Sequence, residues 1–445
     1  MAYAVFLITS SVCFLYIFYR ERRIDIYLVA TASGFLFFLS AYTGRVSGPS
    51  NYPSLSIPPT VYYAFSLYLA ATCFSAFVSD RHDLAKPSPT LAPAYTSSSL
   101  VLSTTILWAA SVCILFWRFP GLLLSGPKRE FISQAGLLQT AMISFSTLAL
   151  TCCLNSRTRG RIPLAITVTG FTVLTGSRTA AAITFVSLVL LHGRTARPVG
   201  LFRKRPLVLP VAIIVLVLMG ASLKMLYGHF RSDGLPGVAY AISNTAPREI
   251  VLRGSEFLST QYIFVDVVRT GYSTDGAHIL RGPLGLLPWP REWFTTQSNE
   301  FNVLFQEELY PDVDYGMAYN PLAEFYSGAR FGGVVIFIAA LQITFAFLNR
   351  TLQSHRYRVW APVVAIGGSL VGFYFHRNSV AVTFGMVRNV LYPFAFLIFL
   401  DMLWNKRPYW ITRKRRAWIG FDSHRNVPWR RQGFSGQKRV LWQRN

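Results

Sequence analysis

Long apolar runs separated by short polar segments dominate this chain of 445 residues. An unbroken apolar run of about 18 or more residues is typical of a helix that crosses a bilayer. The pattern predicts about eleven spans, at residues 2–19, 25–43, 60–79, 100–118, 134–154, 162–175, 179–192, 206–224, 331–348, 359–375 and 380–400. The sixth and seventh runs form a short pair. We therefore expect an all-α polytopic membrane protein.

Basic residues predict how these spans are oriented. Basic segments at 157–161 and 194–205 flank the short pair on both sides. Loops rich in Lys and Arg stay in the cytoplasm, so the chain must cross twice between them and turn at residues 176–178 on the far side. Alternating the loops from Arg20 onward places the N-terminus in the periplasm and the C-terminus in the cytoplasm.

The net charge of +24 fits a membrane better than a nucleic acid. Most of the 43 Lys and Arg lie in the predicted cytoplasmic loops and in the tail 401–445. This distribution is typical of inner-membrane proteins, whose basic loops also attract anionic lipid headgroups. A nucleic-acid partner would need basic residues on a folded soluble module, and we expect none. The five cysteines fall within predicted spans at spacings that suit neither a metal site nor a redox pair.

Four regions follow from this pattern. Residues 1–224 hold the first eight spans, 331–400 hold the last three, and 401–445 form the basic tail. Residues 225–330 are the single long loop, and they carry most of the 19 Asp and Glu. A loop of that length inside a compact protein is usually functional. We expect a folded periplasmic domain there, net negative in contrast to the cytoplasmic loops.

Three helices are predicted in this loop. The first begins near Pro247 and keeps helical spacing until Gly271, and the second spans about 299–310. The third begins at Asn320-Pro321, a cap followed by proline, and continues into the ninth span. The segment 281–291 carries several prolines and glycines, which predict irregular structure.

Arginines at the outer edge of the membrane are the main candidates for chemistry. Arg388 lies in the last span, about 12 Å below the turn at 376–378 by helical rise. An arginine within the bilayer is costly, and it predicts either a functional site or a paired or snorkelling side chain. Both alternatives also apply to Arg178 and Arg253, and Arg253 has glutamates nearby on the same helical face. Together with Arg291 and Arg377, these residues predict a site for phosphate or another anion.

Three further residues are candidates of other kinds. Glu324 is placed to accept a proton from a hydroxyl, or simply to favour the first turn of its helix. His376 beside Arg377 is a hydrogen-bonding candidate or an interfacial histidine. Tyr326 is placed to stack on a sugar ring, although tyrosines are common at interfaces. No metal-ligand spacing, Walker motif or dinucleotide fingerprint is present, so we expect neither a metal nor a cofactor.

These motifs resemble one membrane family. Thr175-Gly176-Ser177-Arg178-Thr179 between two short spans is similar to an element of the O-antigen polymerases (Wzy), also called oligosaccharide repeat-unit polymerases. The segment Asn320–Tyr326 leading into Gly328–Gly333 resembles the end of their large outer loop. Trp289-Pro290-Arg291 is similar to a Trp-Pro-rich segment of the enterobacterial-common-antigen polymerases, which share a comparable layout. The resemblance covers about residues 160–400.

The resemblance implies a GT-C-like glycosyltransferase of the bacterial inner membrane. Such enzymes join undecaprenyl-diphosphate-linked oligosaccharides on the periplasmic face, without metal or nucleotide, and a chain-length regulator is an implied partner. The polymer would be O-antigen of lipopolysaccharide, capsule or exopolysaccharide. The implied catalytic residues are Arg178, Glu324, Arg377 and Arg388, and the implied substrate-binding residues are Arg253, Arg281, Arg291, Tyr326 and His376.

Two alternatives stay open. An O-antigen ligase would transfer the chain to a lipid A core, using similar chemistry. A transporter or flippase of a lipid-linked or anionic substrate would normally show repeated halves and interrupted helices at the midplane. No repeat is visible here, and the candidate residues gather at one predicted face.

Overall fold

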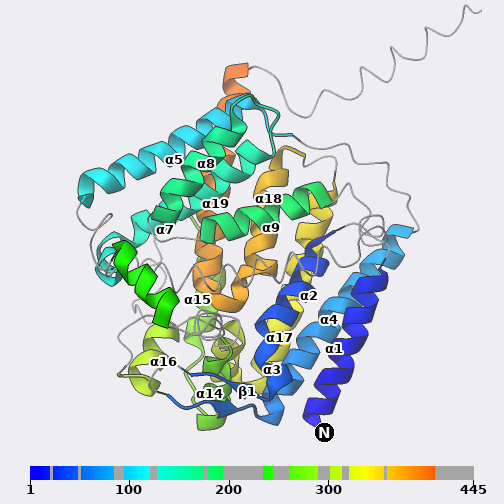
Figure 1. Cartoon of the computed structure of the whole chain (residues 1–445). Helices are drawn as coiled ribbons and strands as arrows, with labels where there is room; N and C mark the ends of the chain where they lie inside the picture. Colours follow the sequence, from blue (N-terminus) through cyan, green and yellow to red (C-terminus); the bar gives the residue numbers. More distant parts are fainter. Residues whose placement is uncertain are drawn as a thin grey trace, which may run out of the picture. The chain divides into compact units, whose positions relative to one another are not determined.

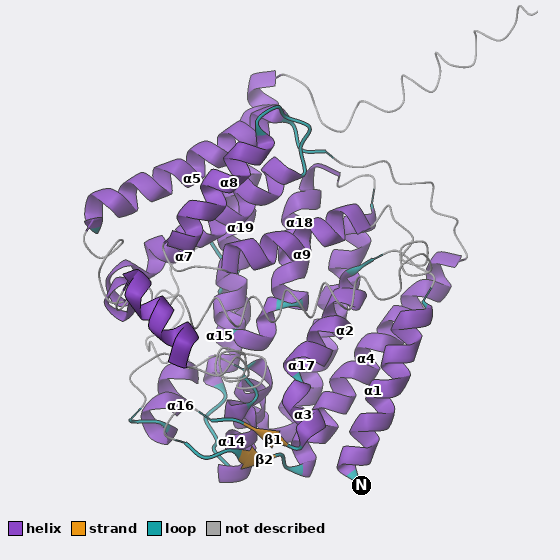
Figure 2. Cartoon of the chain, viewed as in Figure 1, coloured by secondary structure: helices purple, strands orange, loops and turns teal. Residues whose placement is uncertain are grey.

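The computed structural model describes residues 1–20, 24–48, 52–84, 95–120, 128–174, 179–193, 234–244, 260–288, 301–312, 320–354 and 358–405. Residues Met1–Asp401 form one compact unit, and Met402–Asn445 form a second. The described chain is mainly helical, and its two strands are only two residues long each (Figure 2). Arg178, Arg253, Arg291, the eighth expected span and most of the tail lie outside the described residues.

The elements follow one another along the chain as in Figure 1. The first group is α1 (Ala2–Tyr19), α2 (Ile26–Phe37), α3 (Leu39–Thr43), β1 (Arg45–Val46), β2 (Leu55–Ser56) and α4 (Pro59–Leu84). The second group is α5 (Ser98–Arg118), α7 (Lys128–Leu154), α8 (Arg161–Leu174) and α9 (Thr179–Gly193). Residues 234–244 form a short helix, followed later by α14 (Tyr262–Thr270), α15 (Ala277–Leu284) and α16 (Phe301–Leu309). The last group is α17 (Pro321–Gln353), η2 (Arg358–Trp360), α18 (Ala361–Gly372), η3 (Tyr374–Arg377) and α19 (Val380–Asn405).

The predicted membrane character is confirmed by length and composition. Four helices, α4, α5, α17 and α19, are long and apolar enough to cross a bilayer, and shorter apolar helices accompany them. Every expected span within the described residues coincides with helix. The span expected at 25–43 is split at Phe38, where the backbone leaves helical geometry and the ring stacks on Phe65 at 4.0 Å between centroids.

Two groups of loops lie at opposite ends of α4. At its start, Tyr3 near the N-terminus bonds the carbonyl of Tyr42 at 3.0 Å, and Tyr262 of α14 bonds the carbonyl of Pro53 beside β2 at 3.1 Å. The N-terminus, the strand hairpin and α14 therefore share one end of this unit. This grouping agrees with the alternation of loops expected from the charge pattern.

The other end is joined by polar contacts between the segments expected in the cytoplasm. Arg20 after α1 pairs with Asp25 at 2.8 Å and with Asp80 of α4 at 2.7 Å. Ser99 at the start of α5 bonds Asp401 of α19 at 2.7 Å. The three charged groups of the first cluster are largely buried, so the two aspartates offset the cost of burying the guanidinium.

One local expectation was wrong. Residues 281–284 belong to α15, although irregular structure was expected from 281 to 291. Gly282 lets α15 lie directly against α19, because a Cβ there would come within 2.5 Å of a methyl group of Val380. Pro283 sits in the final turn of this short helix, where its missing N–H removes only one hydrogen bond near the end of the helix. Close helix packing outweighs the local preference of the glycine and the proline.

The second and third expected helices of the acidic loop are found. The first is found only from Tyr262, because residues 260–261 form a turn and residues 247–259 lie outside the described residues. The end of the first is confirmed by α14, which stops at Gly271 in the left-handed conformation that glycine favours. The second is confirmed by α16, whose Phe301 and Phe305 are buried. The third is confirmed by α17, which begins with an Asn320 cap and a proline in its first turn.

Candidate functional site

Glu324 lies where the first turn of α17 meets the first turn of α19. It is only 2% exposed, and its Oε2 accepts a hydrogen bond from the backbone N–H of Val380 at 3.1 Å. Both helix starts present the positive end of a helix dipole, which favours a carboxylate. The sequence-predicted acid is therefore buried at the junction of two helices that carry other candidate residues.

The segment before and within α15 is fastened to this turn of α17. The backbone N–H of Thr274 bonds the carbonyl of Ser327 at 3.0 Å, and Gly276 packs closely on Gly328. Arg330 donates to the carbonyl of Gly271 at 3.0 Å. These contacts hold the α14–α15 connection and the first half of α17 as one block around Glu324.

His278 of α15 reaches Glu324 directly. Its Nε2 donates to the main-chain carbonyl of Glu324 at 3.1 Å, and its Nδ1 lies 3.2 Å from the hydroxyl of Thr274. The ring is 3% exposed and stacks on Phe301 of α16 at 5.5 Å between centroids. Sequence reasoning missed His278 as a neighbour of Glu324, because nothing in the linear pattern brings position 278 beside position 324.

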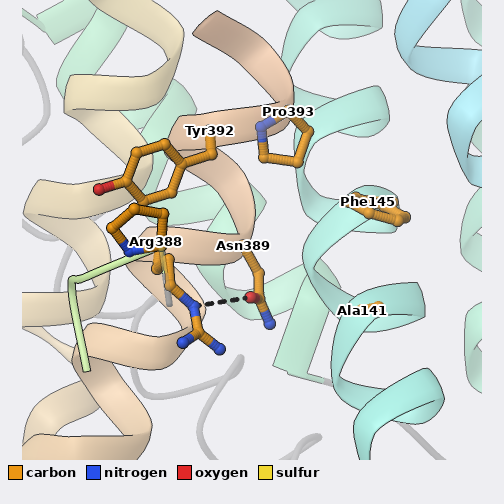
Figure 3. Close-up of a pocket in the computed structure, with 7 residues that line it drawn as sticks. Ala141, Phe145, Arg388, Asn389, Tyr392 and Pro393 are labelled. Atoms are coloured by element: carbon orange, nitrogen blue, oxygen red, sulfur yellow. Dashed lines mark hydrogen bonds between the residues drawn. The ribbon is translucent and has the colours of Figure 1, made fainter. Parts of the chain in front are cut away.

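Arg388 lies in α19 and lines an open pocket of about 450 Å³ (Figure 3). The pocket is bounded by Ala141, Phe145, Pro288, Arg388, Asn389, Tyr392 and Pro393. Within the described part of the chain, no carboxylate pairs with Arg388. Its bonds are long, 3.4 Å to Asn389 and 3.5 Å to the carbonyl of Leu287. Arg388 is thus a cation in largely apolar surroundings whose donors are weakly engaged.

The pocket has an apolar wall from α7 and a more polar wall from α19. Ala141 and Phe145 belong to α7, whereas Asn389 and Tyr392 lie on α19 near Arg388. Tyr392 also donates to the carbonyl of Leu286 at 3.0 Å, which fixes the segment after α15 along α19. An apolar cleft with one guanidinium suits a molecule that has an anionic head and a hydrocarbon tail.

The turn between α18 and α19 carries two predicted residues in different surroundings. Arg377 is partly exposed and lies over the ring of Tyr374 at 5.9 Å. His376 is 2% exposed, stacks on Phe37 and packs edge-on against Tyr68. Burial lowers the pKa of His376 to about 3, so its imidazole is uncharged at neutral pH. Its Nε2 has no hydrogen-bond partner among the described residues.

The short helical pair meets this same turn. Thr179, the first residue of α9, shares a hydrogen bond of 2.7 Å with the hydroxyl of Tyr374 in η3. Farther along, Ser187 of α9 bonds Ser369 of α18 at 2.9 Å. The start of α9 and the α18–α19 turn are therefore neighbours, as a joint site requires. Arg178 itself, one position before Thr179, lies outside the described residues.

The remaining predicted residues are more peripheral. Tyr326 is partly exposed and packs edge-on against Phe264 of α14 at 6.0 Å, with the guanidinium of Arg330 at 5.8 Å from its ring. Arg281 lies in α15, but its side chain is outside the described residues. Three predicted residues with described side chains lie on α19 or next to its start. Arg388 is in α19, Arg377 is in η3 directly before it, and Glu324 of α17 bonds its first residue.

A metal centre finds no support in the described residues, where no group of three His, Cys, Asp or Glu is placed to hold an ion. The chemistry available is that of a carboxylate, two imidazoles and arginines around the first turns of α19. No protein-family model, curated protein or solved structure matches the chain.

Proposed function

We propose that this chain is a membrane glycosyltransferase that joins undecaprenyl-diphosphate-linked oligosaccharide repeat units into a surface polysaccharide. The observation that carries the proposal is Arg388, a guanidinium in an apolar helix that lines an open pocket without a described carboxylate partner. A lipid diphosphate supplies both the anion for this arginine and the hydrocarbon for the walls formed by Phe145 and Pro393. The periplasmic face of a bacterial inner membrane is the proposed place of the reaction.

The proposed reaction is one glycosyl transfer. A sugar hydroxyl on one lipid-linked unit attacks the anomeric carbon of the donor chain. The bond from that carbon to the diphosphate oxygen breaks, and undecaprenyl diphosphate leaves with the bonding electrons. The hydroxyl proton passes to a carboxylate, for which Glu324 is the candidate.

In this scheme, arginines provide most of the stabilisation of the transition state. A diphosphate is already a good leaving group, so the protein mainly needs to position it and to stabilise its developing charge. A pre-organised charge of this kind is worth about 3–4 kcal/mol, or 10²- to 10³-fold in rate. We assign this role to Arg388 and Arg377, and to Arg178 by resemblance. Burial of Glu324 supports its role, because a dry site strengthens its interaction with a hydroxyl.

The test is polymerisation by purified protein in detergent, with lipid-linked repeat units as the sole substrate. The wild type should give a ladder of products, and Arg388→Ala should reduce the rate by about 10²-fold or more. Arg388→Lys should recover only part of the rate, because an ammonium lacks the planar fork that matches phosphate.

Arg81→Ala is the matched control. Arg81 also lies in a long apolar helix, but at the end of α4 distant from Glu324, with its guanidinium over the ring of Phe77. It should give a normal ladder. An unchanged ladder from a folded Arg388→Ala protein would contradict the proposed site. In a parallel reaction that also contains a lipid A core as acceptor, transfer only to that core would identify a ligase. A wild type without product in either reaction would contradict the enzyme assignment.

A further inference from the structure

We infer that His278 is a positioning residue that fixes the catalytic carboxylate of Glu324, an inference that rests on the proposed function. The sequence pattern gives no role to His278. In the structure it is the one described side chain of α15 that hydrogen-bonds Glu324.

The contact is directional and well made. The acceptor is a carbonyl oxygen, so Nε2 must carry the hydrogen of the 3.1 Å bond. The hydroxyl of Thr274 lies 3.2 Å from Nδ1 and is the hydrogen-bond partner of the other ring nitrogen. Both ring nitrogens are therefore used, which fixes the orientation of the imidazole.

The position of this bond along α17 explains its importance. Ala329 and Arg330 have non-helical backbone angles, so the first segment of α17 ends only five residues after Glu324. A helix end leaves carbonyls that other groups must satisfy. The hydroxyl of Ser327 also donates to the carbonyl of Glu324, at 2.9 Å. His278 thus ties the last turn before the kink to α15.

The surroundings of His278 make this tie rigid. Phe301 of α16 stacks on one face of the ring, and Gly276 and Gly328 bring the two backbones into contact nearby. The carboxylate of Glu324 meanwhile holds the N–H of Val380. Elements α15, α16, α17 and α19 therefore meet through His278 and Glu324, and movement of the imidazole would displace the carboxylate.

The expected effect is on the rate of transfer and not on substrate affinity. A misplacement of about 1 Å can reduce a rate about 10²-fold. For His278→Leu we expect kcat to fall roughly 10- to 100-fold, while KM stays within about twofold because the pocket at Arg388 is unchanged. His278→Gln should recover most of kcat, because its amide nitrogen can donate to the same carbonyl.

Phe301→Leu provides the matched control for packing. It disturbs the stack on the imidazole but leaves the Nε2–carbonyl bond in place. We expect it to lower the Tm in detergent by an amount similar to that of His278→Leu, with a clearly smaller loss of kcat, because the bond to the carbonyl of Glu324 remains. Glu324→Gln, compared in the same assay, should be at least as slow as His278→Leu.

Two results would overturn the inference. One is a folded His278→Leu protein with wild-type kcat. The other is a His278→Gln protein as stable as the wild type but as slow as His278→Leu, because the N–H donor would then not be what matters. Either result leaves the proposed function intact if the wild type makes the ladder and Arg388→Ala does not. A wild type without polymerising activity would instead remove the proposed function itself.

Discussion

Single residues show how differently similar side chains are used in this protein. His278 and His376 are both buried histidines, 3% and 2% exposed. His278 makes hydrogen bonds through both nitrogens, whereas His376 lies among aromatic rings with Nε2 unpartnered among the described residues. The described contacts of His278 join α15 to α17, whereas those of His376 are with aromatic rings beside Arg377.

The environment of His376 predicts a pH effect on stability. Its folded pKa is about 3, below the value of about 6.5 expected in an unfolded chain. The unfolded chain therefore binds a proton that the folded chain does not. The uncharged imidazole of His376 therefore contributes fully to the free energy of unfolding above about pH 6.5. This contribution is lost as the pH falls toward 3, by about 1.4 kcal/mol per pH unit.

His376→Phe should remove this loss while keeping the ring packing. Between pH 7 and pH 5, the variant should lose about 2 kcal/mol less stability than the wild type. Thermal unfolding in detergent at the two pH values measures the difference. Parallel changes of Tm in the two proteins would contradict the prediction, because they would show that the folded and unfolded chains bind a proton at His376 equally.

At the scale of elements, α17 is the central structure of the site. Its start is capped by Asn320, its first segment carries Glu324, and its longer segment is apolar enough to cross a membrane. The two segments meet at Arg330, which has φ of 53° and ψ of −149°, a conformation that strongly favours glycine. The guanidinium of Arg330 helps to hold this geometry by donating to the carbonyl of Gly271.

A pair of substitutions separates the backbone strain from the side-chain contact. Arg330→Ala and Arg330→Gly both remove the bond to Gly271, but only glycine also relieves the strain. We expect Arg330→Gly to be more stable than Arg330→Ala by about 1–3 kcal/mol, measured by unfolding in detergent. Equal stability of the two variants would mean that the kink straightens once the guanidinium is gone.

The elements were predictable from the sequence to the extent that their signals are local. Asn320-Pro321 identified the start of α17, and Gly271 identified the end of α14. The helix across 281–284 was not predicted, because it depends on the close approach of Gly282 to Val380, almost a hundred residues away. The role of His278 was hidden for the same reason. Local patterns indicate helices, but long-range contacts decide which side chains meet.

At the scale of the whole molecule, the segments of Met1–Asp401 sort into two groups at opposite ends of α4. Buried charge fastens one group through Arg20, Asp25 and Asp80, whereas aromatic and backbone contacts fasten the other. The alternation of basic loops predicted this grouping from the sequence alone. It did not predict that Thr179 would bond Tyr374, since hydropathy gives no information on which spans are neighbours.

Sidedness is testable with engineered cysteines. Ser273 lies exposed in the α14–α15 connection, and Ser97 lies exposed before α5. In a background with the exposed Cys113 replaced by serine, Ser273→Cys should react with a membrane-impermeant maleimide added to intact spheroplasts. Ser97→Cys should react only after the membrane is permeabilised. The reverse pattern would invert the proposed orientation, and reaction of both in intact spheroplasts would contradict the two-ended arrangement.

The kink in α17 also has a consequence for the lipid itself. A straight helix of 33 residues would be about 50 Å long, well beyond a hydrocarbon layer of about 30 Å. The part after the kink is about 34 Å long, which is close to the thickness of that layer. Helices that are too long for a bilayer usually tilt, and the kink makes such a tilt unnecessary here. Under the proposed function, acyl-chain length would be a variable of the reaction, because the thickness of the bilayer would set how far Glu324 stands above it.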